Sequence, residues 1–429
     1  MLLQSTISSN EFDRALDVGR PPNIKRLFPH SRALLVSGKV IDRAMLGKGR
    51  TMTIAANGRN SFVIRGALRA AQRAQAGIII EIAKSEGGRN AYCACCFWNL
   101  ARQVDALCNE MNITVPVAIH ADHYAIKGSG DLLEARTEIP SLFDAGITSI
   151  AVDASHLPDA DNLLANIELA PFIPSWAGYE TEVGEIKGKE GLSTPEEALF
   201  LIRGLNAHSI FPDWIALNNG TTHGIEAEGD GIQVGLTTTI HDALAPYGVS
   251  GAQHGTSGNS STRLREIATR TRTTKANVAT ALQMISWGVQ VNEYGNAVVD
   301  GDGILVKRSG QGMSDPVWEE MVAFARERGI TGGNFKKLNL PFENKLLAQS
   351  AQVRERMVEG VEAFVYDLLV DVFDAADTAP RAVELLLESG THDLGSKGRQ
   401  IETPSDWTEE AIRATAPGGS RGHGGEYDD

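Results

Sequence analysis

Three histidines in the chain have the kind of neighbours that metal-binding histidines need. His123, His223 and His254 each come at the end of a short apolar segment, in the contexts HADHY, TTHG and QHGTSG. Three neutral imidazoles with a fourth position open to water or substrate form a common type of catalytic zinc site. One histidine in such a place is more often a packed or surface group, but three at comparable places predict a metal centre.

Carboxylates accompany these histidines. Asp122 directly precedes His123, Asp153 ends the segment TSIAVD, and Glu182 lies in ETEVG. A carboxylate beside a metal ligand can move the proton that a bond-breaking step requires. We expect Asp122 to do so and to point away from His123, because successive side chains of a strand face opposite sides. In a regular strand His120 lies on the same side as Asp122. The pattern is equally consistent with two roles for it, a hydrogen bond that orients the site or packing in the core.

The elements that must position these residues are eight short apolar segments that alternate with longer amphipathic ones. The strand candidates are 51–57, 76–83, 115–122, 148–155, 176–184, 212–220, 248–255 and 274–280. Helix-like segments between them include 61–74, 99–111, 159–169, 195–206, 235–245 and 261–270. This alternation is typical of a parallel sheet covered by helices. Because no glycine-rich dinucleotide fingerprint occurs, a closed (β/α)8 TIM barrel is favoured over an open doubly wound sheet.

A polar side chain occurs at or near the end of each strand candidate. These residues are Asn57, Ser85, Asp122, Asp153, Glu182, His223, His254 and Asn277. Active sites of such barrels lie at the carboxyl ends of the strands. The recurrence at eight strand ends therefore predicts one site at that end of the barrel.

The rest of the chain divides by pattern. We expect an N-terminal extension over 1–45, the barrel over 46–290, an insertion and closing helices over 291–380, and a C-terminal tail over 381–429. A hairpin or excursion is expected over 295–312, and helices over 314–328 and 349–375. The last residues, TAPGGSRGHGGEYDD, are rich in glycine and charge, which is typical of a mobile chain end.

Composition narrows the class of protein. With 42% hydrophobic and 22% charged residues, the chain is typical of soluble globular proteins. A formal net charge of −14 argues against nucleic acid or an anionic membrane as the partner. We recognise neither a signal peptide nor an apolar run of about 20 residues that could span a bilayer.

Four cysteines, three of them in YCACC, do not form a disulfide framework and lack the CxxC spacing of a zinc knuckle. We expect them to be small buried residues on a helix, in a protein of the reducing cytoplasm.

Six motifs resemble, in order, those of class II, zinc-dependent fructose-bisphosphate aldolases and the related tagatose-bisphosphate aldolases. They are HADHYAIK, SIAVDAS, ETEVGEIKGKEG, NNGTTHG, QHGTSG and KANVAT, within about residues 50–285. The resemblance implies a carbon–carbon lyase of carbohydrate metabolism that binds one catalytic zinc ion, with a monovalent cation as a candidate additional ion. It also implies a homo-oligomer, either dimer or tetramer. The favoured substrate is the glycolytic fructose 1,6-bisphosphate, cleaved to dihydroxyacetone phosphate and glyceraldehyde 3-phosphate. The alternative is another phosphorylated ketose, such as tagatose bisphosphate.

The resemblance also implies roles for single residues. His123, His223 and His254 match the metal ligands, and Asp153 and Glu182 match carboxylates near an alternative metal position. Asp122 matches the acid/base beside the first ligand, and Glu190 matches the loop glutamate that moves a proton on the triose. The matches to substrate and triose phosphate positions are Asn57, Ser85, Gly224, Gly255, Ser257, Asn277 and Thr280.

The chain departs from the family's pattern at the phosphate end of the site. HGTSG stands where HGGSG is usual, so Thr256 crowds the phosphate loop, and Ala279 stands where an aspartate is usual. After the second ligand, HG is usually followed by an aromatic residue and a lysine, whereas here HGIEAEG places Glu226 and Glu228 where positive charge is expected. No arginine for a second phosphate is identifiable, and the candidates are Lys84, Arg89, Arg354 and Arg356. We therefore expect weak discrimination between bisphosphate and monophosphate ketoses.

Two interpretations from other classes fit less well. A zinc hydrolase of the amidohydrolase kind carries an HxH pair on its first strand, whereas the first strand candidate here ends in Asn57. A non-catalytic barrel homologue used for binding predicts lost ligands, whereas all three histidines and both acid/base carboxylates are present.

Overall fold

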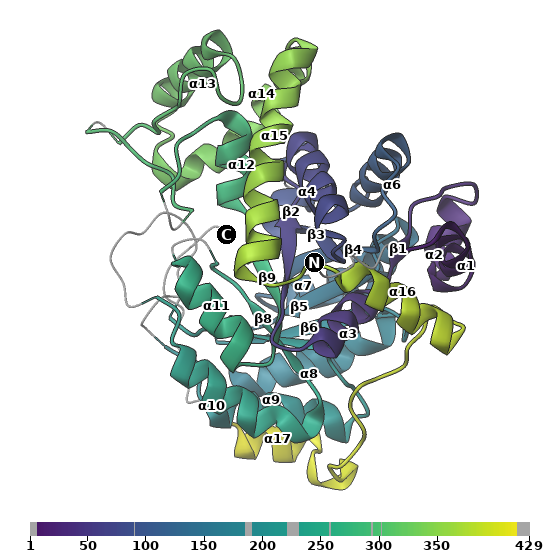
Figure 1. The fold of residues 1–429 in the computed structure, drawn as a ribbon. Helices are drawn as coiled ribbons and strands as arrows, with labels where there is room; N and C mark the ends of the chain where they lie inside the picture. The colour runs from purple at the N-terminus through teal and green to yellow at the C-terminus, as the bar shows by residue number, and fades with distance from the viewer. Residues whose placement is uncertain are drawn as a thin grey trace.

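Eight parallel strands form a closed barrel at the centre of the protein (Figure 1). The computed structural model describes residues 7–89, 91–184, 191–220, 231–256, 259–292, 295–301 and 303–417. The barrel strands are β2 Thr53–Asn57, β3 Ile78–Ala83, β4 Val117–Ala125, β5 Ser149–Asp153, β6 Gly178–Val183, β7 Trp214–Leu217, β8 Ser250–Gln253 and β9 Thr273–Val278. Each strand candidate of the sequence overlaps one of these strands, so the predicted (β/α)8 barrel is confirmed.

The strands follow one another around the barrel in chain order, and β9 pairs with β2 to close it. Registers such as Glu81 with His120 and Ala55 with Asn277 align the strands. A further short strand, β1 Leu35–Val36, pairs with the start of β4. Because all strands run in one direction, their carboxyl ends meet at one end of the barrel, where the predicted polar residues must converge.

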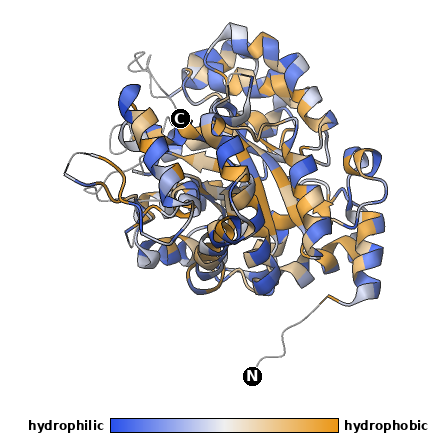
Figure 2. Cartoon of the chain, turned by 90° about the horizontal axis from the view of Figure 1, so that it is seen from above, coloured by the Kyte–Doolittle hydropathy of each residue, from blue (hydrophilic) through white to orange (hydrophobic). Residues whose placement is uncertain are grey.

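Helices surround the barrel and turn their apolar sides towards the strands (Figure 2). Their bounds are α1 Ser9–Gly19, α2 Pro22–Leu27, α3 Gly38–Lys48, α4 Ser61–Ala74, α5 Lys84–Gly87, α6 Leu100–Met111, α7 Ser129–Asp144, α8 Asp159–Leu169, α9 Pro195–Ala207, α10 Val234–Leu244, α11 Ser261–Arg270, α12 Thr280–Trp287, α13 Asp315–Glu327, α14 Asn339–Leu347, α15 Ala351–Asp367, α16 Thr378–Ser389 and α17 Glu409–Thr415. Short 3-10 turns are η1 Ala170–Phe172, η2 Ala245–Tyr247, η3 Gly332–Leu338 and η5 Pro404–Asp406, and η4 Leu368–Val372 is a π-helical turn.

Local sequence explains where these helices begin. Asn60 accepts hydrogen bonds from the backbone N–H groups of Phe62 and Val63 and so caps α4. Thr194 and Glu197 form a capping box at the start of α9, which satisfies two backbone donors that the helix itself leaves unpaired. All six predicted helix segments of the barrel are confirmed by α4, α6, α8, α9, α10 and α11.

Helices from opposite ends of the sequence pack together, because α1 and α3 both contact α16 (Figure 1). Beyond α16, Lys397 reaches the amino ends of β7 and β8, where its Nζ lies 2.9 Å from the carbonyl oxygen of Asp213 and 2.7 Å from Ser250 Oγ. The C-terminal segment thus covers the end of the barrel opposite the predicted site. The division of the chain at 45, 290 and 380 stays a prediction, and the glycine-rich tip from 418 onward lies outside the described residues.

The segment between α12 and α15 has an apolar cluster of its own, which includes Trp287, Trp318 and Phe335. Isolated antiparallel bridges join 289 to 307, 291 to 297 and 299 to 305, as expected for a hairpin-like excursion. α13 and α15 confirm the helices predicted over 314–328 and 349–375. α15 packs along α4, and so attaches this segment to the barrel.

The cysteines are only partly as expected. All four have free thiols, and Cys93, Cys95 and Cys108 are buried. Cys108 lies on α6, but Cys93, Cys95 and Cys96 lie in a region of bends and turns, so their predicted helix is wrong. Within the described ranges, no helix combines the length and the apolar character needed to cross a bilayer.

Candidate active site

Strand β4 is irregular where the candidate residues lie. Its register with β5 shifts between Ala121 and Tyr124, and His123 has a φ of 40°, a region that residues other than glycine seldom adopt. A bulge of this kind redirects the side chains that follow it. Asp122 and His123 consequently both contact groups at the carboxyl end of the barrel. The prediction that they point in opposite directions is wrong, because it assumed a regular strand.

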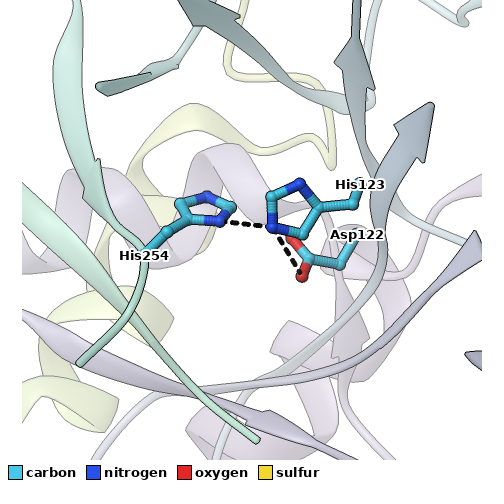
Figure 3. A group of neighbouring side chains, drawn as sticks. All are labelled: Asp122, His123 and His254. Carbon is cyan, nitrogen blue, oxygen red and sulfur yellow. Dashed lines mark hydrogen bonds and ion pairs between the residues drawn. The ribbon is translucent and has the colours of Figure 1, made fainter. Parts of the chain in front are cut away.

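The rings of His123 and His254 face each other across this end of the barrel (Figure 3). His123 Nε2 lies 2.7 Å from His254 Nδ1. On the outer side of the pair, His123 Nδ1 lies 3.0 Å from Glu182 Oε1 and 3.2 Å from Asp153 Oδ2. His254 Nε2 lies 2.9 Å from Glu180 Oε1. Each ring therefore has a carboxylate on one nitrogen and the other ring on its second nitrogen.

This arrangement fits a divalent metal ion. Metal-binding histidines commonly donate their second ring N–H to a carboxylate, which fixes tautomer and orientation. Asp122, His123 and His254 are all buried, and each offers a ligand atom within 4.8 Å of the others. A second group, His123 with Asp153 and Glu182, uses the opposite nitrogen of His123, as the resemblance implied for an alternative metal position. His223, the third expected ligand, lies outside the described residues.

The buried charges at this site shift one another's pKa values. Burial alone would raise the pKa of Asp122, but the positive charges of His123 and Lys275 hold it well below its usual value. Burial disfavours the charged form of His123, yet Glu182 and Asp122 raise its pKa well above the usual value. Burial, followed by the charge of Asp153, raises the pKa of Glu182. The site thus stabilises positive charge at His123, which is also where a bound cation would lie.

A second layer of ionisable residues, which the sequence analysis missed apart from His120, lies beneath these rings. Lys275 Nζ lies 2.7 Å from Glu180 Oε2, 3.4 Å from Asp122 Oδ1 and 3.4 Å from Glu81 Oε2. It also lies 3.1 Å from His120 Nε2.

Strand alternation carries a signal for two of the missed residues. Lys275 precedes Asn277 by two positions, and Glu180 precedes Glu182 by two, so each shares a face with a residue already predicted. Glu81 is a single carboxylate in the otherwise apolar strand IIIEIA. His120, which the sequence left between two roles, is hydrogen-bonded, because its Nδ1 lies 2.7 Å from Ser149 Oγ.

Two asparagines predicted to contact substrate flank the site on neighbouring strands. Asn277 Nδ2 donates to Asp122 Oδ1 at 2.9 Å, and Asn57 Nδ2 donates to Glu86 Oε2 at 2.5 Å. Their Oδ1 atoms are buried without a hydrogen-bond partner among the described residues. A buried acceptor of this kind needs a donor, and a substrate hydroxyl can supply one.

A buried ion pair supports this side of the site. Arg59 Nε donates to Glu86 Oε1 at 2.7 Å, and its Nη1 lies 3.3 Å from the hydroxyl of Thr280 at the start of α12. The pair joins two candidate substrate residues, Asn57 and Thr280, and the sequence analysis did not identify it. The charge of Glu86 favours the ionised form of Arg59 against its burial and raises its pKa.

Other candidates are less completely described. Ser85 lies exposed on α5, and Gly255 has a φ of 59°, which favours glycine there. Thr256 is buried and donates its hydroxyl to Gln253 O. Candidates outside the described residues are Glu190, Gly224, Glu226, Glu228 and Ser257.

The four cations considered for a second phosphate all have protein partners. Lys84 Nζ donates to Ala125 O at 3.0 Å, and Arg89 pairs with Glu134 at 3.3 Å and Glu138 at 3.2 Å. On α15, Arg354 donates to Leu347 O and Arg356 to Gly312 O.

Comparisons with known proteins agree with this geometry. The sequence model of the family described as "Fructose-bisphosphate aldolase class-II" matches residues 39–328. A fructose-bisphosphate aldolase of Staphylococcus aureus is 28% identical over 193 residues, 41% of this chain and 61% of that protein. Another from Streptococcus pyogenes is 31% identical over 231 residues, 51% of this chain and 69% of that protein. The match to the first of these relatives spans less than two thirds of its length.

Solved structures support the fold alone, because the identities are low. The YdjI aldolase from Escherichia coli matches with a TM-score of 0.54 and 15% identity, over 80% of this chain and 99% of that one. A fructose-bisphosphate aldolase from Campylobacter jejuni matches with a TM-score of 0.52 and 18% identity, over 81% of this chain and 97% of that one.

Proposed function

Because the chain belongs to the class II fructose-bisphosphate aldolase family, we propose that it is a metal-dependent aldolase that reversibly cleaves a phosphorylated ketose. The observation that carries the proposal is the facing pair of His123 and His254 beside Asp122, each ring backed by a carboxylate. Family members are generally metal-dependent, and these donors suit zinc, which favours nitrogen ligands in catalytic sites.

Retro-aldol cleavage breaks the bond between the third and fourth carbons of the ketose. Electrons from that bond move toward the carbonyl at the second carbon, and negative charge develops on its oxygen. A divalent ion held by His123, His254 and His223 would stabilise this charge as a Lewis acid. Burial of both described ligands strengthens the electrostatic effect, since little water screens it.

Asp122 is the proposed base for cleavage. It takes the proton of the hydroxyl on the fourth carbon, and it returns that proton in condensation. Asn277 and Lys275 occupy its Oδ1, so Oδ2, which is 4.0 Å from His123 Nε2, is the oxygen nearest the proposed ligands. Glu190 is proposed to move the second proton, on the carbon of the departing triose.

The proposed substrate is fructose 1,6-bisphosphate, with another phosphorylated ketose as the second candidate. The relatives named fructose-bisphosphate aldolase support the first. The second is favoured because Lys84 and Arg89 already contact carbonyl and carboxylate oxygens. Neither cation therefore binds a second phosphate without giving up part of these contacts. Substrate contacts are assigned to Asn57 and Ser85, and recognition of the triose phosphate to Gly224, Gly255, Ser257, Asn277 and Thr280.

The decisive experiment is condensation. The zinc-loaded protein is incubated with dihydroxyacetone phosphate and a panel of phosphorylated and neutral aldehydes, and the products are identified by mass spectrometry and NMR. We expect a ketose phosphate with a new bond between its third and fourth carbons. Absence of product with every aldehyde, from protein that retains zinc, would leave only the non-catalytic interpretation.

A further inference from the structure

We propose that Lys275 is a positioning residue of this site, whose buried ammonium group fixes Glu180 and Asp122 and, through Glu180, the ring of His254. The kinetic part of this inference rests on the proposed function, whereas the metal-binding part does not. Lys275 belongs to the motif KANVAT, in which the resemblance gave roles to Asn277 and Thr280 but none to Lys275.

The ammonium group of Lys275 is surrounded by ionisable side chains. The side chain of Lys275 is fully buried, and four side chains surround its Nζ. Glu180 lies at 2.7 Å and His120 at 3.1 Å, and Asp122 and Glu81 each lie at 3.4 Å. A fully buried lysine is rare unless paired, and here one cation joins side chains from β3, β4 and β6 across the interior of the barrel.

Glu180 links Lys275 to His254. The two oxygens of Glu180 have different partners, since Oε2 accepts from Lys275 at 2.7 Å and Oε1 lies 2.9 Å from His254 Nε2. A carboxylate at Nε2 favours the tautomer with its proton on that nitrogen. The lone pair then lies on Nδ1, the nitrogen that faces His123. Lys275 thus holds the carboxylate that orients His254 for a metal.

Lys275 also affects which donor atoms a metal ion can use. Glu81, His120 and Asp122 also offer ligand atoms within 4.8 Å of one another. The Lys275 ammonium lies within 3.4 Å of an atom of each, so its positive charge stands among these donors and repels a second cation. A divalent ion is therefore directed to the ligand atoms of His123 and His254, nearer the carboxyl end of the barrel.

The test begins with zinc alone. Zinc affinity is measured by competition with a chromophoric chelator, and the absorption spectrum of the cobalt-substituted protein reports ligand geometry without any substrate. Lys275→Met keeps an unbranched side chain and removes the charge. We expect its zinc affinity to fall by about 10- to 100-fold, the usual effect of losing support behind a ligand, and its cobalt spectrum to change. With ketose phosphate, kcat should fall more than KM rises.

The matched control is Lys397→Met, which removes another lysine that pairs with a buried aspartate, Asp42, at the opposite end of the barrel. It should lower stability but leave zinc affinity and the cobalt spectrum unchanged. If it lowered zinc affinity as much as Lys275→Met, the effect would be merely structural and the proposal would be wrong.

A double variant isolates the route through Glu180. Lys275→Met leaves the carboxylate of Glu180 buried without its cation, whereas Lys275→Met with Glu180→Gln removes both charges and remains testable even if the single variant does not fold. Because both changes act on His254 through Glu180, the loss of zinc affinity in the double variant should be clearly smaller than the product of the two single losses. If the loss of zinc affinity in the double variant equalled the product of the losses in Lys275→Met and Glu180→Gln, the two residues would act independently, which would contradict the proposed route through Glu180.

Two outcomes separate this inference from the proposed function. Wild-type zinc affinity and an unchanged cobalt spectrum in Lys275→Met would overturn the positioning role. A wild-type protein that binds zinc but cleaves no ketose phosphate would overturn the aldolase assignment, and the zinc comparison would still decide the role of Lys275.

Discussion

Asn277 holds the carboxylate of Asp122, with 2.9 Å between the amide Nδ2 and Oδ1, although 155 positions separate the two residues in the chain. In the closed parallel barrel, the carboxyl ends of β4 and β9 lie at the same end of the barrel. An amide that donates to one carboxylate oxygen fixes the plane of the group, which leaves the second oxygen in a defined direction. In the proposed reaction, this is the oxygen that exchanges the proton.

Asp122→Asn is therefore expected to stop bond cleavage while the protein retains its metal. The loss should be about 10² to 10⁴ in kcat, the usual contribution of a general acid or base. Ketose cleavage is followed in a coupled assay, and zinc content is measured on the same sample. Glu190→Ala is the companion variant and should mainly slow solvent deuterium exchange into dihydroxyacetone phosphate. Cleavage by Asp122→Asn within tenfold of wild type would exclude Asp122 as the base.

Metal removal is expected to abolish activity. A chelator should inactivate the protein and added zinc should restore it, because in the proposed reaction His123 and His254 would hold the ion that stabilises the developing charge. His123→Ala and His254→Ala should each bind zinc much more weakly, as should His223→Ala. His241→Ala deletes a buried imidazole elsewhere on α10 and should retain zinc. Full activity in metal-free protein would point instead to a lysine Schiff base.

The sequence predicted the barrel because each strand has a short apolar run that ends in a polar residue. It could not predict the bulge in β4, since a register shift depends on pairing with β5 rather than on the residues HADHY. The contact of His123 with Glu182 and Asp153 follows from that bulge.

The layer around Lys275 was missed for another reason. Strand alternation places Lys275 and Glu180 on the face of residues already predicted, but the sequence alone does not show whether their charges are buried or paired. Only the convergence of strands shows that Lys275 lies between Glu81 and Glu180. The pair of Arg59 with Glu86 was missed likewise, because its two members come from different strand–helix connections.

Stability should depend on pH through His241. Burial, with the charge of Arg272, lowers the pKa of His241 from its ordinary value of 6.5 to about 4. Between these values the unfolded chain binds a proton that the folded chain does not, so stability is lost as pH falls from 6.5 towards 4. The linkage is worth up to about 3 kcal/mol. Denaturant unfolding of wild type and His241→Gln should show a difference that shrinks by about 2 kcal/mol from pH 7 to pH 4.5. Parallel pH curves would contradict the assignment.

The contact between α4 and α15 should tolerate no side chain at Gly66. A Cβ there would lie 2.7 Å from Val361 Cβ and 2.8 Å from Val358 O, atoms that cannot rotate away. Gly66→Ala should therefore cost about 1–3 kcal/mol by overpacking, despite the helix propensity of alanine. Gly47→Ala in α3 is the control, because a Cβ there would meet no described atom within 4 Å apart from its chain neighbours and the backbone of its own helix. It should be neutral or stabilising by up to about 1 kcal/mol. Equal unfolding free energies for the two variants would show that the helices can separate without cost.

Discrimination between ketose bisphosphates and monophosphates is expected to be weak. A second phosphate needs a cation that is not already paired, yet Arg89 pairs with Glu134 and Glu138, and Lys84 donates to Ala125 O and lies 3.9 Å from Asp131. Releasing either cation requires breaking those contacts, which offsets part of the gain from the phosphate. Steady-state kinetics should give kcat/KM values for fructose 1,6-bisphosphate and fructose 1-phosphate that differ by less than about a thousandfold, some 4 kcal/mol. Ser257→Ala, proposed for the shared triose phosphate, should weaken both substrates alike. A larger preference for the bisphosphate would reveal a dedicated second site, and the loss of that preference in Arg89→Ala or Lys84→Ala would identify its cation.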